Sequence, residues 1–434
     1  MPGNAPRVAV VGAGWAGLAA AVQATRQRAR VTLFEMARDP GGRARQARAA
    51  GTEPVDGDPL SPLDNGQHIL IGAYSATLAL MREVGAQPQD LLWRGPLSLR
   101  YPDGSGLQLP EGRPALAFAR GVVSARGWSW ADKRALLGWA VGRWLHRFDC
   151  DEVATVATLC RGLTPRIRRD LVEPLCVAAL NTPMDQASGR VFLRVLHDAL
   201  LGGRGSADLL LPRAPLSALL PGPALAWLAG AGADCRLGQR VRQLASSGAG
   251  WAVDGEPFDA VVLACSAVEA ARLARPTDPG WADTAARLRY EPIVTAWLTD
   301  ASLRLPQPMT ALRAGPDDPA QYLFDLGLLG VAPQTFAFVV SGAAPWLAQG
   351  LDRTADAVVA QARRAFPGAF AQDQPLRHIA AERRATFACT PGLSRPPMAL
   401  APGLLAAGDY IAGPYPATLE GAVRSGRAAA QALA

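Results

Sequence analysis

The chain has 434 residues, of which 49% are hydrophobic and 19% charged, with a net charge of +7. This length allows two or three domains with a large core, and the mean hydropathy of +0.08 suggests apolar internal surfaces. No block of basic residues with interleaved aromatics is present, so we expect no nucleic-acid partner, although the positive charge permits attraction to anionic membranes.

Six cysteines are scattered along the chain without a CxxC pair or a histidine at ligand spacing. We therefore expect reduced cysteines that pack as small hydrophobic side chains, and no metal site. The uncharged run 326–351 is long enough to span a bilayer, but it contains Pro333 and Pro345. Its TFAFVVSG segment is typical of a buried strand. We expect a cytoplasmic protein, either soluble or peripheral on the inner face of the cytoplasmic membrane.

The most informative segment lies near the N-terminus. The continuous apolar run Val8–Val11 predicts a parallel strand covered on both faces. Gly12, Gly14 and Gly17 follow as GxGxxG, and a helical pattern, Leu18–Arg26, comes next. In such a turn the glycines allow a tight bend, close approach of a pyrophosphate, and close packing of the helix on the strand. The phosphates would bind free N–H groups at the helix start. Ala13, Trp15 and Ala16 belong to the same predicted loop.

A second predicted strand, Arg30–Glu35, ends in a carboxylate. Glu35 is placed to accept hydrogen bonds from the ribose hydroxyls of an adenosine, which argues against a 2′-phosphate on that nucleotide. With strand, helix, strand and terminal acid in order, the segment predicts a Rossmann-like dinucleotide site. No second GxGxxG follows a strand, so we expect no built-in NAD(P)H site.

Two further motifs follow this site. RDPGGRAR is a Gly-Gly-Arg turn that contains Gly42, Arg43, Ala44 and Arg45. DNGQHILIGAY, residues 64–74, is an apolar strand-like run headed by polar residues, although the chain has only four histidines in all. Such a polar head can be an ordinary turn before a strand. Its function depends on what lies next to it.

Residues 118–149 hold four tryptophans among arginines. Helical spacing places Leu136, Trp139, Ala140 and Arg143 on one mixed apolar and basic face. Two interpretations stay open. The segment is either a packed helix whose arginines extend to solvent, or a helix that lies on a membrane surface.

The rest of the middle section mixes helices and strands. Residues 164–200 are apolar and helical in pattern, which suits the walls of a cavity. A helix is predicted over Pro215–Leu228, and FDAVVLAC, residues 258–265, predicts another buried strand of the nucleotide sheet. Residues 289–386 alternate strands and helices and predict a sheet beneath the substrate.

The C-terminal segment, GLLAAGDYIAGPYPATLEGAVRSGRAAAQAL, predicts a strand, then Gly408 and Asp409, then a helix that begins near Thr418. Together with RDPGGRAR, this ending resembles flavoproteins of the amine oxidase and phytoene desaturase superfamily. The resemblance implies FAD as cofactor. It also implies an α/β fold, in which a Rossmann-like FAD-binding domain of the GR2 type carries an inserted α+β substrate domain.

The resemblance also assigns roles to residues. It implies that the backbone at Gly42 passes the FAD and that Arg43 lies near the pyrophosphate and flavin. Asp409 would bond the ribityl chain or pyrophosphate, and Val241 would lie in a strand that touches the adenine end. N–H groups at a helix start would face the flavin's pyrimidine edge, where the helix dipole favours negative charge. These N–H groups belong to Ala417, Thr418 and Leu419.

The same resemblance implies a discontinuous FAD-binding domain interrupted by two insertions. We expect this domain to comprise residues 1–110, 205–275 and 388–434. The substrate domain would comprise residues 111–204 and 276–387, including the helical segment that could face a membrane.

DNGQHILIGAY and AGDYIAGPYPATLEGAVRSG resemble one member family more closely, the hydroxysqualene dehydroxylases, over nearly the whole chain. This resemblance implies reductive chemistry in squalene and hopanoid synthesis. A C30 hydroxysqualene would lose its allylic hydroxyl, and reduced flavin would supply hydride to give squalene. The external electron donor is not identified by the sequence.

In the superfamily, the 64–74 segment passes close to the isoalloxazine ring. We hypothesise that His68 donates the proton to the departing hydroxyl or orients the donor, because histidine titrates near neutrality. Asp64, Asn65 and Gln67 would support the turn or the flavin. The alternative is that His68 only bonds backbone or flavin, and Tyr410 and Tyr415 are further candidates for proton delivery.

Three other functions remain open from the sequence. A phytoene-type or diapophytoene-type desaturase would use the same FAD but remove hydride from its substrate. An amine oxidase would need aromatic side chains that cage an amine, and no such pair is identified. A FAD-stabilised carrier would deliver a triterpenoid without redox turnover.

Overall fold

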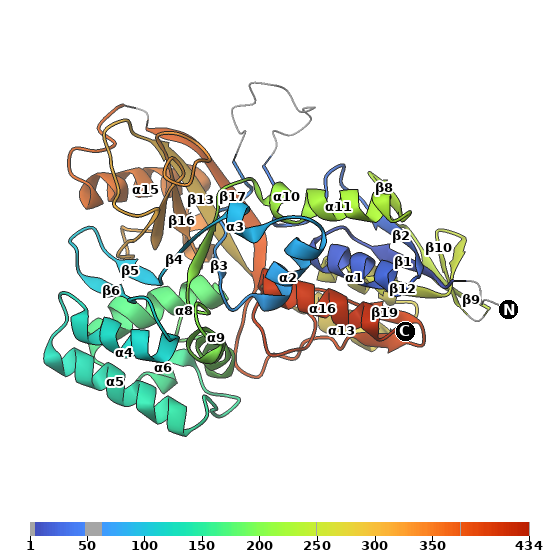
Figure 1. The fold of residues 1–434 in the computed structure, drawn as a ribbon, viewed down its shortest axis with the longest axis horizontal. Coiled ribbons are helices and arrows are strands. Elements are labelled where there is room, and N and C mark those ends of the chain that lie inside the picture. Colours follow the sequence, from blue (N-terminus) through green and yellow to red (C-terminus); the bar gives the residue numbers. More distant parts are fainter. Residues whose placement is uncertain (1–4, 48–62, 249, 374, 434) are drawn as a thin grey trace.

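The computed structural model describes residues 5–47, 63–248, 250–373 and 375–433 of the chain. Figure 1 shows an elongated molecule, with a parallel sheet and its helices at one end and an antiparallel sheet at the other. A group of helices lies beside the antiparallel sheet. None of the helices in the described ranges is both long and apolar enough to cross a bilayer.

The parallel sheet has the strand order β18-β19-β12-β1-β2-β8, and only β18 runs antiparallel to its neighbour. Its central strand β1 is buried from Val8 to Val11, because an interior parallel strand is covered on both faces. The first and last long helices, α1 and α16, pack against each other, and α11 also packs on α1. The bounds are β1 (Arg7–Val11), α1 (Trp15–Arg26), β2 (Arg30–Glu35), α11 (Pro221–Gly230), β8 (Asp234–Leu237), β12 (Ala260–Leu263), β18 (Ala399–Ala401), β19 (Leu404–Ala406) and α16 (Leu419–Gln431).

The antiparallel sheet has the order β14-β15-β16-β13-β17, with α14 and α15 packed beside it. Strand β16 is buried at every position, so the run 326–351 contains the buried strand that the sequence predicted. The bounds are β13 (Tyr290–Thr299), β14 (Met309–Ala311), β15 (Tyr322–Asp325), β16 (Thr335–Val340), α14 (Ala344–Leu347), α15 (Leu351–Ala365) and β17 (Leu376–Phe387).

Between these sheets lies a three-stranded antiparallel sheet in which β7 pairs with β3 on one side and β4 on the other. This sheet joins the 64–74 segment, through β3, to β7, which lies more than a hundred positions later in the chain. The elements of this middle part are β3 (Leu70–Ile71), α2 (Ser75–Glu83), α3 (Pro88–Leu91), β4 (Leu92–Gly95), β5 (Ser98–Arg100), β6 (Gly106–Gln108), β7 (Leu209–Pro212) and α10 (Leu216–Leu219).

The helical group includes α5, which matches the helix predicted within residues 118–149, and the helices predicted over residues 164–200. It consists of α4 (Pro114–Ser124), α5 (Trp130–Leu145), α6 (Val156–Leu159), α7 (Pro165–Ile167), the π-helical turn η1 (Arg168–Val172), α8 (Glu173–Leu180) and α9 (Gly189–Leu201). The remaining elements flank the parallel sheet. They are β9 (Leu244–Ser247), β10 (Gly250–Val253), β11 (Glu256–Phe258), α12 (Ala267–Ala274) and α13 (Pro279–Ala286).

The predicted elements of the parallel sheet are found with small shifts. Strand β2 has the predicted bounds, whereas α1 starts at Trp15 rather than Leu18. The single helix expected over 215–228 is two helices, α10 and α11. The break falls at Leu220, whose φ of −141° is not helical and which precedes a proline.

Candidate cofactor and substrate site

The GxGxxG turn brings backbone segments closer together than side chains would allow. Gly12 has φ +111°, and a Cβ there would lie 2.7 Å from the Ala264 carbonyl oxygen. A Cβ on Gly17 would lie 1.8 Å from the Gly12 carbonyl oxygen. The Gly12 N–H donates to the Phe34 carbonyl at 2.7 Å, which ties the turn to β2. Gly12 therefore allows the tight turn, and Gly17 the close packing of the helix, that the sequence predicted.

The start of α1 is built to receive an anion. Its N-cap, Gly14, supplies no side-chain hydrogen bond, and its first turn holds no acidic residue. The first N–H groups of a helix have no partner within the helix, and its dipole favours negative charge there. Ala13 and Ala16 are buried beside this turn, and the indole N–H of Trp15 donates to the Ala44 carbonyl at 3.1 Å.

The second glycine turn lies directly against the first. Gly41 pairs with Gly14 in an isolated parallel bridge, and the Gly41 N–H donates to the Ala13 carbonyl at 2.8 Å. Gly42 has φ +62°, and a Cβ there would lie 3.3 Å from the Gly14 Cα. The GxGxxG turn and the Gly-Gly-Arg turn thus form one continuous backbone surface, with no side chain between Gly14 and Gly42.

Glu35 lies at the end of β2, as predicted. Its carboxylate accepts from the Ala13 N–H at 2.7 Å and from the Ala37 N–H at 2.8 Å. Each carboxylate oxygen keeps a further lone pair, so the group is oriented without being saturated. Val241 is buried, but it lies three residues before β9. The strand expected at Val241 begins only at Leu244.

An ion pair joins the two remote chain ends. The Arg43 guanidinium lies 2.6 Å from a carboxylate oxygen of Asp409, and it also donates to the Ala385 carbonyl at 2.7 Å. Burial acts to lower the pKa of Arg43, but the Asp409 carboxylate offsets this and the net shift is upward. Gly408 precedes the pair, and its N–H donates to the Ser425 hydroxyl at 3.1 Å.

Tyr410 supplies a buried polar atom that the described residues leave unsatisfied. Its hydroxyl has no hydrogen-bond partner among them, although such groups are normally paired when buried. Asp409 and Arg43 are among the charges near it. A polar group of a bound cofactor is a suitable partner at this position.

The 64–74 segment is attached to the Gly-Gly-Arg turn, and the residues that follow it are attached to α16. The Asn65 side-chain amide donates to the Arg43 carbonyl, and the Asn65 N–H donates to the Arg45 carbonyl at 3.1 Å. Just beyond its other end, the Ala76 N–H donates at 3.0 Å to the carboxylate of Glu420, in the first turn of α16, whose N-cap is Thr418. Ala417 and Leu419 flank that cap and are half-buried. The structure therefore brings together the polar segment and the predicted flavin-facing helix start.

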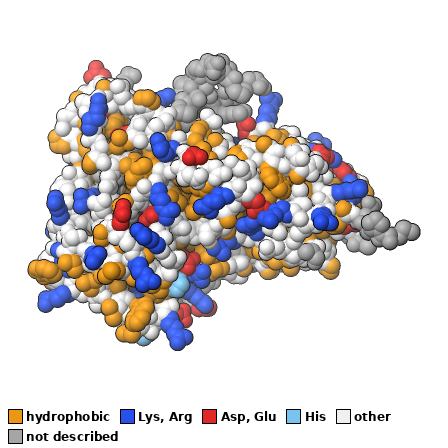
Figure 2. Space-filling model, in the orientation of Figure 1, with side chains coloured by type: hydrophobic (Ala, Val, Ile, Leu, Met, Phe, Trp, Pro, Cys, Tyr) orange, Lys and Arg blue, Asp and Glu red, His pale blue; other side chains and the backbone are white. Residues whose placement is uncertain are grey.

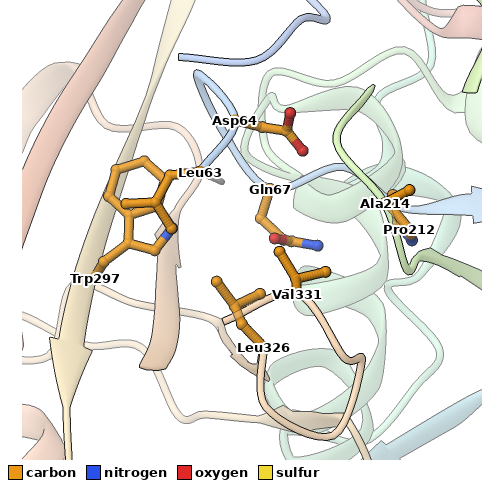
Figure 3. Close-up of a pocket in the computed structure, with 8 residues that line it drawn as sticks. All are labelled: Leu63, Asp64, Gln67, Pro212, Ala214, Trp297, Leu326 and Val331. Carbon is orange, nitrogen blue, oxygen red and sulfur yellow. The ribbon is translucent and has the colours of Figure 1, made fainter. Parts of the chain in front are cut away.

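A small cavity lies beside this segment (Figure 3). Asp64 and Gln67 project toward the space between Trp297 of β13 and the Pro212–Ala214 stretch at the end of β7. The remaining lining residues are apolar: Leu63, Leu326 and Val331. Trp297 is 1% exposed, and it could not be predicted from the sequence because one tryptophan in a long buried strand has no distinguishing pattern.

Asp64 and His68, at the polar head of the segment, have shifted pKa values. Burial raises the pKa of Asp64 to about 7, partly offset by the hydrogen bond that it accepts from the Leu216 N–H at 2.9 Å. Burial also lowers the pKa of His68, a shift that the Arg43 charge reinforces and a bond to Gly66 opposes. The His68 Nδ1 lies 2.9 Å from the Gly66 carbonyl oxygen. Because a carbonyl only accepts, Nδ1 carries the hydrogen, and Nε2 of the neutral ring is an acceptor.

A further cation supports the C-terminal loop and was not predicted. Arg395 donates to the carbonyls of Asp409 at 3.3 Å and Tyr415 at 2.9 Å, and it lies over the Phe387 ring. Burial lowers its pKa. It lies within a proline-rich loop without periodicity, so no sequence signal distinguished it from the many other arginines.

A parallel sheet with a glycine-rich turn, an uncapped helix start and an acid at the end of the second strand defines a dinucleotide-binding fold of the Rossmann-like class. The family model described as flavin containing amine oxidoreductase matches residues 15–434. The chain therefore belongs to this family, and its cofactor is FAD. The glycine surface, the open helix start and the unpaired Tyr410 hydroxyl fit that cofactor.

Individual relatives are similar over nearly the full length. The chain is 30% identical to a hydroxysqualene dehydroxylase of Sinorhizobium fredii, over 99% of this chain and 98% of the relative. It is also 30% identical to the protein of that name in Rhodopseudomonas palustris, over 98% and 97%. Among solved structures, an oxidoreductase from Methanosarcina mazei aligns with a TM-score of 0.70 at 15% identity, covering 97% of this chain and 99% of that one.

Proposed function

We propose that this protein reduces hydroxysqualene, a C30 isoprenoid alcohol, to squalene with loss of water. The near full-length similarity to two hydroxysqualene dehydroxylases supports the substrate class. The observation that carries the proposal is the placement of the 64–68 segment. It is bonded to the Arg43 backbone on one side, and on the other Asp64 and Gln67 line a small cavity whose remaining lining residues are apolar.

The reaction needs an electron pair at carbon and a proton at oxygen. Reduced FAD supplies hydride when bound. The carbon–oxygen bond breaks, the departing hydroxyl takes a proton and leaves as water, and the carbon gains the hydride. Because hydroxide is a poor leaving group, a proton donor near the hydroxyl is essential.

Two residues of the segment are candidates for proton delivery. Asp64 lines the cavity and, with a pKa of about 7, still holds a proton on a substantial fraction of molecules at neutral pH. The sequence favoured His68, but its lowered pKa leaves it mainly neutral at pH 7, with only Nε2 free. We therefore propose Asp64 as the donor, with His68 and Asn65 holding the turn and Gln67 orienting the hydroxyl.

The apolar walls would keep bulk water from the reacting carbon. Trp297, Leu326 and Val331 offer no polar atom that could hold a nucleophilic water beside a cationic centre, apart from the indole N–H. Replacing them with polar residues should increase capture of the ionised substrate by water at the expense of squalene.

We also propose that the domains divide as the sequence suggests, at 1–110, 205–275 and 388–434 for FAD and 111–204 and 276–387 for substrate. The parallel sheet takes its strands from the first set of ranges. A cytoplasmic location is consistent with six free cysteines.

The test is product analysis with purified protein reduced by light under anaerobic conditions. Hydroxysqualene should give squalene and reoxidise the flavin, whereas squalene offered to oxidised protein should give no desaturated product. Desaturation of squalene would instead favour the phytoene-type reaction, and inert reduced flavin with bound hydroxysqualene would favour a carrier.

The donor assignment has its own test. Asp64→Asn should lower turnover at neutral pH by about 100-fold while FAD stays bound, within the usual range for removing a general acid. His68→Gln should lose less. If His68→Gln is the more damaging variant and Asp64→Asn stays near normal, the donor is His68.

A further inference from the structure

The exposed apolar side chains of this molecule are concentrated on one helical region. Twelve large hydrophobic residues are exposed among the described residues, and eight of them lie between Leu116 and Leu201. Figure 2 shows orange patches along the lower left edge, where Figure 1 places α4 and α5. We define the docking face as Leu116, Val123, Trp130, Val141, Trp144 and Leu145.

Helix α5 contributes most of this face through one stripe. Trp130, Val141 and Leu145 are spaced by 11 and 4 residues, which places them on the same side of a helix of 3.6 residues per turn. They are 68%, 56% and 67% exposed. The opposite side holds Leu136, which is buried, and Trp139, whose indole N–H donates to the Leu159 carbonyl at 2.8 Å.

This arrangement differs from the face that the sequence suggested. Leu136 and Trp139 form the inner side that fixes α5 to the protein, and Trp128 is also buried. Trp130 and Trp144 are the tryptophans left outside. The inner side of α5 already fixes the helix to the protein. Its exposed apolar stripe is therefore not needed for packing within the chain.

The charge along α4 and α5 is almost wholly positive. Residues 113–148 contain seven Lys and Arg and one acidic residue, Asp132. That carboxylate is 6% exposed and is bonded within the capping box to the Ser129 N–H at 2.8 Å. Lys133 lies over the Trp130 ring, with its Nζ 5.0 Å from the ring centroid. Basic and apolar groups thus alternate over the same surface.

We propose that this face docks on an anionic lipid bilayer. Tryptophan, leucine and basic side chains together suit the boundary between headgroups and acyl chains, where each has its preferred surroundings. A second copy of the chain is a poor occupant, because two strongly basic faces would be brought together. An anionic lipid surface supplies the complementary charge.

Bilayer binding itself does not depend on the reaction. Its use by the enzyme rests on the proposed function, since a C30 isoprenoid would be taken from the bilayer rather than from water. For this reason the test reads membrane binding directly and needs no turnover.

The test is flotation of the FAD-loaded protein with vesicles of phosphatidylcholine alone or with one third phosphatidylglycerol. The wild type should float with the anionic vesicles at low salt, and at least about tenfold less with neutral vesicles or in 0.5 M NaCl. The triple variant Trp130→Ser, Trp144→Ser, Leu145→Ser should bind at least about tenfold less.

The matched control replaces exposed apolar residues elsewhere, Val268→Ser with Leu328→Ser, and should float like the wild type. FAD content and circular dichroism check that all variants are folded. The proposal is overturned if the wild type stays unbound with both vesicle types, or if the triple variant floats as well as the control. Sedimentation that reveals a wild-type dimer and a monomeric triple variant would assign the face to a second copy instead.

Discussion

Helices α1 and α5 show how differently the two ends of this molecule are constrained. Nine of the twelve residues of α1 are buried, whereas only Asp132 and Leu136 of the sixteen in α5 are buried. At the cofactor end, backbone contacts require particular glycines, so single residues determine the geometry. At the α5 end, side chains face outward and few positions affect stability. A substitution should therefore act through folding and FAD at one end and through surface binding at the other.

Gly17→Val should have the largest effect. A Cβ there would lie 1.8 Å from the Gly12 carbonyl oxygen, a backbone atom that cannot move without opening the turn. We expect insoluble or unfolded protein, measured as soluble yield and circular dichroism. Gly230→Ala, where a Cβ meets nothing within 4 Å, is the matched control and should stay folded.

Gly14→Val should separate cofactor binding from folding. A Cβ at Gly14 would meet only the Gly42 Cα, at 4.0 Å, so the protein without FAD should tolerate the first added carbon. The pyrophosphate would approach this backbone, so we expect FAD affinity to fall by about 100-fold, a loss of about 3 kcal/mol. Fluorescence titration of the FAD-free protein measures this loss. Unchanged affinity would remove Gly14 from the cofactor site.

Asp64→Asn should change the pH dependence of stability. The pKa of Asp64 is about 7 in the folded protein, above the value of about 3.9 for an unfolded chain. The folded state therefore holds more protons between these values, and the wild type loses stability as pH rises from about 4 to about 7. Melting temperatures should be measured from pH 4.5 to 8.5. The melting temperature of the variant should rise relative to that of the wild type up to about pH 7, and the difference should then stay constant. A difference independent of pH would contradict the raised pKa.

The smallest effect on stability is expected at Trp144, and Trp297 serves as the buried comparison. Trp144→Ser, at 61% exposure, should change the free energy of unfolding by less than about 0.5 kcal/mol. Trp297→Ala, at 1% exposure, should cost about 3 to 5 kcal/mol. Urea denaturation compares the two. A large loss for Trp144→Ser would mean that α5 packs more tightly than its exposure indicates.

The same contrast explains how much the sequence could predict. The glycine turns, Glu35 and the start of α16 were predictable because each is a local pattern with a backbone reason. The cavity was not, because Trp297 and Pro212 come from separate strands and meet Gln67 only in the folded chain. The outward face of α5 was also missed. Which side of an evenly mixed helix is buried depends on its neighbours, here Leu159, and not on its own spacing.

The most direct test of the account is an anaerobic single turnover that follows the flavin spectrum and the lipid product together. Fully reduced protein mixed with one equivalent of hydroxysqualene should form about one squalene for each flavin reoxidised, at the same rate. Reoxidation without squalene, or squalene without reoxidation, would contradict the proposed dehydroxylation.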